Sequence, residues 1–118
     1  MTGPKPEGLR GKLQTNHLIS VAEAVTMAAR YRTANPGGVR AWLFDRQAVD
    51  ALLAQPGCAG IRIYRAMPDA GVEPQVVLVG TDQDGNDLVA AKATDPGLVA
   101  ERAWPCPPDC GKASILGG

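Results

Sequence analysis

Two closely spaced cysteines in the C-terminal part of the chain are candidates for metal binding or thiol chemistry. Cys106 and Cys110 lie within Trp-Pro-Cys-Pro-Pro-Asp-Cys-Gly, residues 104–111. Thiolates spaced by two to four residues chelate zinc in structural sites, and a glycine after the second cysteine resembles a metal-binding knuckle. The usual knuckle has a shorter spacing, and a tetrahedral site needs further ligands. Cys58 and the single histidine, His17, are the candidates for them.

The same cysteine pair has two other interpretations. A Cys106–Cys110 disulfide closes a very short loop, which stabilises little, and a cytosolic location would keep it reduced. A redox site usually has Cys-x-x-Cys at a helix N-terminus, where the thiol pKa is lowered, and this stretch differs in spacing and in its prolines. In the third interpretation both cysteines pack as small apolar residues. The pattern favours the third interpretation and leaves the other two open.

Cys58 and His17 also form a candidate nucleophile and base for a small hydrolase or transferase. Cys58 lies in Gln-Pro-Gly-Cys-Ala-Gly, residues 55–60, which is typical of a tight helix-to-strand connection. His17 adjoins a Pro- and Gly-bearing tail, a poor setting for a general base. No phosphate-binding loop, nucleophile elbow or His-Glu-x-x-His helix is found. We therefore expect no catalytic residues and no cofactor, with zinc as the alternative.

The acidic stretch Asp-Gln-Asp-Gly-Asn-Asp, residues 82–87, resembles a calcium loop only in part. With Gly85 at the sixth position of such a loop, the first position is Gly80 and the twelfth is Ala91, and neither supplies a carboxylate. The stretch instead predicts a hairpin turn built on Asp-Gly chemistry.

Length and composition bound the class of protein. The chain has 118 residues, which favours one domain, and 45% of them are hydrophobic. Lys plus Arg is 12 and Asp plus Glu is 12, so no global field attracts nucleic acid or an anionic membrane. No apolar run could span a bilayer or act as a signal peptide, and three cysteines make no disulfide framework. We expect a cytoplasmic protein without nucleic-acid or membrane partners.

The chain first predicts a flexible N-terminal tail, residues 1–17, and then a helix. Ser20 and Glu23 form a capping box, and Asn35-Pro36-Gly37-Gly38 ends the helix. Arg32 falls close to the apolar stripe, where a long side chain snorkels at a helix end. The expected buried stripe comprises Val21, Ala24, Val25, Ala28 and Tyr31.

Strand signals follow. Residues 39–44 predict a strand, and Asp45 caps a second helix whose inner face holds Val49, Leu52 and Leu53. Residues 60–64 and 75–79 predict a hairpin joined at Pro-Asp-Ala-Gly, residues 68–71, and the second of these strands is apolar on both faces, as in a central strand. If the strands at 39–44 and 60–64 share a sheet, they are parallel. Residues 88–93 are the fourth candidate strand, and a turn is expected at 94–97.

These elements predict a single α+β domain over residues 18–93. Two helices pack on a mixed, mostly antiparallel sheet of about four strands. Residues 94–118, rich in Pro, Cys and Gly, form an irregular C-terminal strap over it.

Four stretches of the chain resemble a group of small, uncharacterised bacterial proteins. They are Ile-Ser-Val-Ala-Glu-Ala (19–24), Gly-Ile-Arg-Ile-Tyr (60–64), Val-Leu-Val-Gly (77–80) and Cys-Pro-Pro-Asp-Cys-Gly (106–111). The likeness covers most of the chain from Leu18 onward. The resemblance implies a bacterial cytosolic protein and carries no activity, ligand or catalytic residue.

For function, the sequence favours a non-enzymatic soluble interaction module whose partner is another protein or a second copy of itself. The reasons are the lack of converging catalytic residue types, of a cofactor motif and of charge asymmetry. The alternative is a cysteine-dependent zinc or thiol-redox protein that uses Cys106 and Cys110, with Cys58 and His17 as further ligands. An exposed apolar patch near Trp42, Trp104 or Met67 would favour the interaction module.

Overall fold

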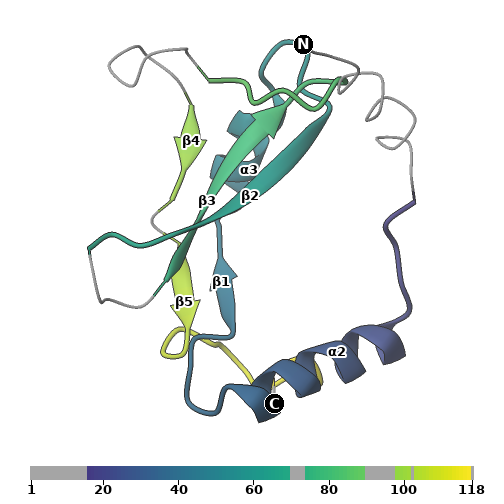
Figure 1. Ribbon diagram of the computed structural model, residues 1–118, viewed down its shortest axis with the longest axis vertical. Coiled ribbons are helices and arrows are strands. Elements are labelled where there is room, and N and C mark those ends of the chain that lie inside the picture. Colours follow the sequence, from purple (N-terminus) through teal and green to yellow (C-terminus); the bar gives the residue numbers. More distant parts are fainter. Residues whose placement is uncertain (1–15, 70–73, 90–97, 102, 118) are drawn as a thin grey trace, which may run out of the picture. The chain divides into compact units, whose positions relative to one another are not determined.

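The computed structural model describes residues 16–69, 74–89, 98–101 and 103–117, which form two compact units. Unit 1 contains α3 (Arg46–Leu53), β2 (Gly60–Ala66), β3 (Gln75–Thr81) and β4 (Val99–Ala100). Unit 2 contains α2 (Val21–Ala34), β1 (Ala41–Leu43) and β5 (Trp104–Cys106) (Figure 1). The described residues therefore hold two helices and two small antiparallel sheets, and the predicted α+β class is confirmed.

The sheet of unit 1 has the order β2-β3-β4. β2 and β3 pair in antiparallel register over their whole length, from Gly60 opposite Thr81 to Ala66 opposite Gln75. β4 pairs with the other edge of β3, so the predicted hairpin and the predicted central position of β3 are both confirmed. The predicted turn at 68–71 lies partly outside the described residues, since 70–73 are not among them.

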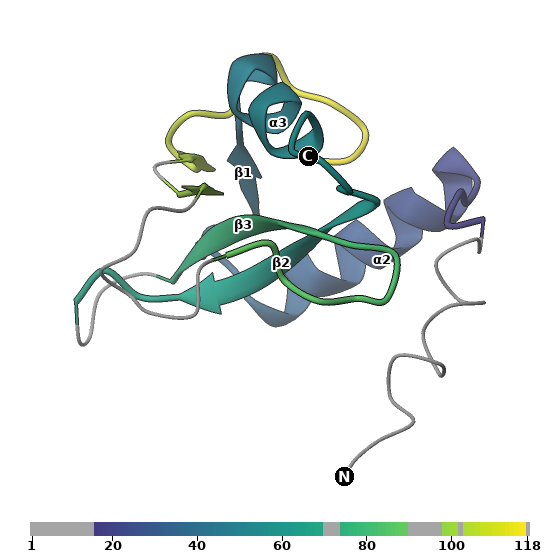
Figure 2. The ribbon, with the colours of Figure 1, turned by 90° about the horizontal axis from the view of Figure 1, so that it is seen from above.

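Helix α3 lies against one face of this sheet (Figure 2). Its residue Leu52 is only 1% exposed, whereas the adjacent Leu53, also expected on the inner face, is 49% exposed. Asp45 occupies the N-cap position without a side-chain capping hydrogen bond. The buried apolar side chains of unit 1 include Leu52 of α3 and Val76, Leu78 and Val79 of β3, with Val79 on the opposite face of the strand from Val76 and Leu78.

Gly80 allows the end of α3 to approach β3 closely. A Cβ atom at this position would lie 2.8 Å from Nε2 of Gln55 and 3.0 Å from Sγ of Cys58. A larger residue at this position would therefore have to displace the side chains of Gln55 and Cys58.

The acidic stretch after β3 forms a turn, as predicted. The carboxylate of Asp82 accepts hydrogen bonds from the backbone N–H groups of Asp84 and Asn86, each at 2.9 Å, and Gly85 has a positive φ of 87°. The hydrogen bond from the backbone of Asn86 is the main cause that lowers the pKa of Asp82. An isolated antiparallel bridge between Thr81 and Asp87 closes the turn.

In unit 2, the capping box of α2 is confirmed. The backbone N–H of Glu23 donates to the hydroxyl of Ser20 at 3.0 Å, and the backbone N–H of Ser20 donates to the Glu23 carboxylate. The expected buried stripe was wrong, because no residue of α2 is buried and both Val21 and Tyr31 are exposed. Two of the five stripe residues are alanines, and the sheet among the described residues of unit 2 is a pair of three-residue strands, which offers little surface for burial.

The second sheet contains a pairing that the sequence pattern did not predict. β1 pairs in antiparallel register with β5, with Ala41 opposite Cys106 and Leu43 opposite Trp104. β1 and β2 therefore lie in different sheets and are not parallel neighbours. The C-terminal segment, expected to be irregular, holds the short strands β4 and β5. Leu88 and Val89 belong to no strand, while 90–93 and the predicted turn at 94–97 lie outside the described residues, as do 1–15 of the expected tail.

Candidate functional site

A pocket of about 480 Å³ lies within unit 2. Its walls come from the C-terminal half of α2, from β1 and β5, and from the segment that follows β5. Its larger side chains include those of Tyr31, Trp42, Leu43, Trp104 and Leu116. The charged groups that line it are Arg32, Arg40 and Asp109, so cations outnumber carboxylates by two to one.

A disulfide bond between Cys106 and Cys110 forms part of the pocket wall. Cys106, the last residue of β5, is 8% exposed, whereas Cys110 is an exposed residue. The loop between them is held by a backbone hydrogen bond of 2.8 Å from Asp109 N–H to the Pro105 carbonyl. The bonds Cys106–Pro107 and Pro107–Pro108 are cis peptides. The structure therefore contains the disulfide, and the favoured interpretation, two cysteines that pack as small apolar residues, was wrong.

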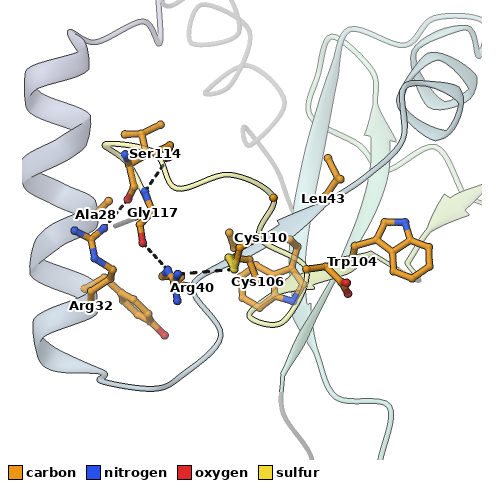
Figure 3. Close-up of a pocket in the computed structure, with 15 residues that line it drawn as sticks. Ala28, Arg32, Arg40, Leu43, Trp104, Cys106, Cys110, Ser114 and Gly117 are labelled. Carbon is orange, nitrogen blue, oxygen red and sulfur yellow. Dashed lines mark hydrogen bonds between the residues drawn. A yellow bond between two sulfur atoms is a disulfide. The ribbon is translucent and has the colours of Figure 1, made fainter.

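The side chain of Arg40 contacts both the C-terminal segment and this disulfide. Its Nε donates a hydrogen bond of 2.8 Å to the carbonyl of Gly117, and its Nη2 lies 3.8 Å from Sγ of Cys110 (Figure 3). The backbone N–H of Arg40 also donates to the carbonyl of Cys106 at 2.8 Å. The guanidinium group therefore lies between the C-terminal segment and the sulfur atom, with a defined orientation.

Arg32 binds the same segment from the side of α2. Its Nη1 donates to the carbonyl of Leu116 at 2.5 Å. This contact accounts for the position of Arg32 beside the apolar residues of the helix better than snorkelling into solvent does. The hydrogen bond to Leu116 uses one of the five N–H donors of the Arg32 guanidinium group. Arg32 also lines the pocket.

The rim of the pocket presents large apolar side chains. Leu43 and Trp104 are direct cross-strand partners, so their side chains leave the β1–β5 ladder on the same face, and they are 57% and 54% exposed. Tyr31 and Leu116 are also exposed. The buried indole Nε1 of Trp42 has no hydrogen-bond partner among the described residues.

The other two residues of the predicted zinc set, Cys58 and His17, belong to different units. Cys58 is a half-buried free thiol in unit 1, and its Sγ donates to the carbonyl of Gly60 at 3.3 Å. His17 is exposed in unit 2, ahead of α2. Within the described ranges, no three His, Cys, Asp or Glu side chains form a group that could hold a metal ion. The set Cys106, Cys110, Cys58 and His17 stays a prediction.

A polar cluster lies beside β2 among the described residues of unit 1. The carboxylate of Asp87 accepts from Nη1 of Arg62 at 2.5 Å and from the hydroxyl of Tyr64. The hydrogen bond to Asp87 is the main cause that raises the pKa of both Arg62 and Tyr64. The cluster attaches the turn at 82–87 to β2, which is a structural role.

Sequence reasoning identified the cysteine pair but missed Arg40. Arg40 has no local signal of function, since it simply lies between a Gly-Gly pair and a short apolar strand. Its contacts are to residues 77 and 70 positions away. Of the three residues expected near an exposed patch, Trp104 in unit 2 and Met67 in unit 1 are exposed, while Trp42 is half-buried.

Comparison with protein families, curated proteins and solved structures found no match to this chain. In the described ranges, no helix has both the length and the apolar character needed to cross a membrane.

Proposed function

We propose that the chain is a non-enzymatic interaction module that binds a segment of a partner protein at the unit 2 pocket. The segment carries a bulky apolar side chain next to a carboxylate. The observation that supports this proposal is the exposed cross-strand pair Leu43 and Trp104 at the rim of a pocket lined by two arginines. Tryptophan and arginine are the residues most enriched at the energetic centres of protein interfaces.

A protein segment fits this site better than a small molecule does. The pocket volume of about 480 Å³ lies within the range for small ligands, but the apolar surface continues past it onto exposed side chains. Leu43, Trp104 and Ile115 are all more than half exposed. A larger partner would cover these side chains and remove their apolar surface from water.

Charge complementarity selects an acidic segment. Arg32 and Arg40 face the pocket together with the single carboxylate of Asp109. A guanidinium forms two parallel hydrogen bonds with a carboxylate, a geometry that adds specificity to affinity. Acidic and basic residues are equally numerous in the whole chain, so its net charge does not attract acidic segments. The preference for an acidic segment comes from the two arginines at the pocket.

A random peptide library displayed on phage and selected on the immobilised full chain tests the proposal. We expect the selected peptides to carry Asp or Glu beside Leu, Phe or Trp. Trp104→Ala should weaken their binding by about 30-fold or more, the loss expected for an interface hot spot. Ile63→Ala is the matched control, because Ile63 is an exposed apolar strand residue of unit 1.

Three results would contradict the proposal. Selected peptides without carboxylates would exclude the charge argument. Equal losses for the Trp104 and Ile63 variants would exclude the pocket as the binding site. Sedimentation showing a dimer that Trp104→Ala dissociates would assign the rim to a second copy of the chain.

A further inference from the structure

We infer that the Cys106–Cys110 disulfide is a thiol–disulfide exchange site in which Cys110 is the reactive sulfur and Arg40 stabilises its thiolate. The inference is independent of peptide binding, because it depends on the contact between Arg40 and Cys110 and on the unequal exposure of the two cysteines. The chemical class of its reaction partner is a dithiol, either a small molecule or a pair of protein thiols.

Exposure decides which sulfur an incoming thiolate attacks. Cys110 is exposed and lies in the segment after β5, whereas Cys106 is buried at the end of β5 opposite Ala41. Exchange requires access of the attacking thiolate to the sulfur. Both cysteines line the pocket, and the more exposed residue, Cys110, receives the attack.

The exchange proceeds in two steps, and its atoms and electrons balance. A thiolate of the dithiol attacks Sγ of Cys110 and forms a new S–S bond, while the Cys106–Cys110 bond breaks and its electron pair leaves on Sγ of Cys106, which takes up a proton from water. The second thiolate of the reductant then attacks the reductant's own sulfur in the mixed disulfide. This closes the reductant's disulfide and releases Cys110 as a thiolate. Two electrons pass from the dithiol to the protein.

Arg40 acts on the second step. Its Nη2 lies 3.8 Å from Sγ of Cys110 and its Nε is held by the Gly117 carbonyl, so a positive charge is already oriented at the sulfur that leaves. A cation next to a cysteine lowers the thiol pKa, and a thiol of lower pKa leaves faster. Cys106, buried in β5, has no comparable bond from a cationic side chain in the described part of unit 2.

Other charged and titratable groups surround Cys110. Asp109, its neighbour in sequence, lines the same pocket and opposes the thiolate, while Arg32 and Tyr31 line the wall on α2. Lys112 follows two positions later and is exposed. Only Arg40 makes a hydrogen bond to the sulfur among the described residues of unit 2.

The short loop favours reduction. The two cysteines have a sequence separation of 4, so the entropy that the cross-link removes from the unfolded chain is small. A disulfide that stabilises its protein little resists reduction less than one that closes a long loop.

The test uses the full chain with Cys58→Ser, reduced with dithiothreitol and freed from it. Alkylation by iodoacetamide is followed by mass spectrometry across a pH series, with Cys106 and Cys110 separated by fragmentation. We expect Cys110 to react at least about threefold faster than Cys106 at about pH 7, with its midpoint below about 8.5, the ordinary pKa of a free cysteine. Equal rates, or faster reaction of Cys106, would overturn the inference.

Variants at Arg40 separate its charge from its structural role. Arg40→Met should slow Cys110 alkylation by about threefold to tenfold at about pH 7, while Arg40→Lys should restore most of the rate because it keeps a cation at this position. Arg32→Met is the matched control, since Arg32 binds the same segment without a bond to the sulfur. An unchanged pH profile in Arg40→Met would refute the role of Arg40. If circular dichroism shows that Arg40→Met is unfolded, the comparison of Cys110 with Cys106 in the Cys58→Ser background decides.

Discussion

Two adjacent leucines of α3 offer a test of the packing in unit 1. Leu52 is 1% exposed and Leu53 is 49% exposed, although both belong to the same helix and were expected on the same inner face. Leu52→Ala and Leu53→Ala make the same chemical change in the same turn of helix. Their difference in helix propensity therefore cancels, and the difference in burial remains.

The expected magnitudes follow from burial. A buried CH₂ group contributes about 0.8 kcal/mol, so truncating Leu52 to alanine loses about 2.4 kcal/mol of transfer free energy. The cavity left behind raises the loss in unfolding free energy to about 3–4 kcal/mol, because the close approach of Gly80 to this helix end limits collapse. Leu53 is already half in water, so Leu53→Ala should cost about 1 kcal/mol.

The assay must report on unit 1. Trp42 and Trp104, the two tryptophans of the chain, belong to unit 2, so tryptophan fluorescence reports on the unfolding of unit 2. We would measure amide hydrogen exchange in β3 peptides in urea by mass spectrometry, with far-UV circular dichroism as the global probe. Equal losses for the two variants, or a loss below about 1.5 kcal/mol for Leu52→Ala, would refute the assigned core.

Two further predictions concern acid stability and the cysteines. The pKa of Asp82 is lowered in the folded state, mainly by the backbone hydrogen bond from Asn86, so its contribution to stability is present above its unfolded pKa and is lost as pH falls through its folded pKa. Asp82→Ala should therefore lower the melting temperature at about pH 7, and the difference from the parent chain should shrink as the pH falls through the folded pKa of Asp82; a difference that is independent of pH would contradict this. For protein purified without a metal-affinity tag, we expect Cys58 to be the one free thiol before reduction, all three cysteines to react after it, and zinc to be well below one ion per chain. Stoichiometric zinc with masked thiols would instead support the set Cys106, Cys110, Cys58 and His17.

Local signals predicted the elements whose stabilising contacts are close in sequence. Ser20 and Glu23 are three positions apart, so the capping box could be identified without knowing the fold. The turn chemistry around Gly85 and the apolar run of β3 likewise indicated a hairpin turn and a central strand. Each of these features depends on neighbours within one turn or one hairpin, and each was confirmed.

The extent of burial could not be predicted from periodicity. The pattern placed Leu52 and Leu53 on one inner face, but a helix has one direction of closest approach to the sheet, and only Leu52 points along it. The apolar stripe of α2 satisfied the helical period and still buried no residue. Periodicity identifies which side chains share a face, whereas burial depends on what covers that face.

The sequence by itself determined the α+β class, the capped first helix, the β2–β3 hairpin and the chemistry available in the cysteine pair. Only the tertiary structure decided that β1 pairs with β5, that Cys106 and Cys110 form a disulfide, and that Arg40 reaches Cys110 and Gly117. The physical reason is the separation of the partners along the chain. Contacts across 70 or more residues depend on the packing of whole segments, and neither residue type nor spacing records them.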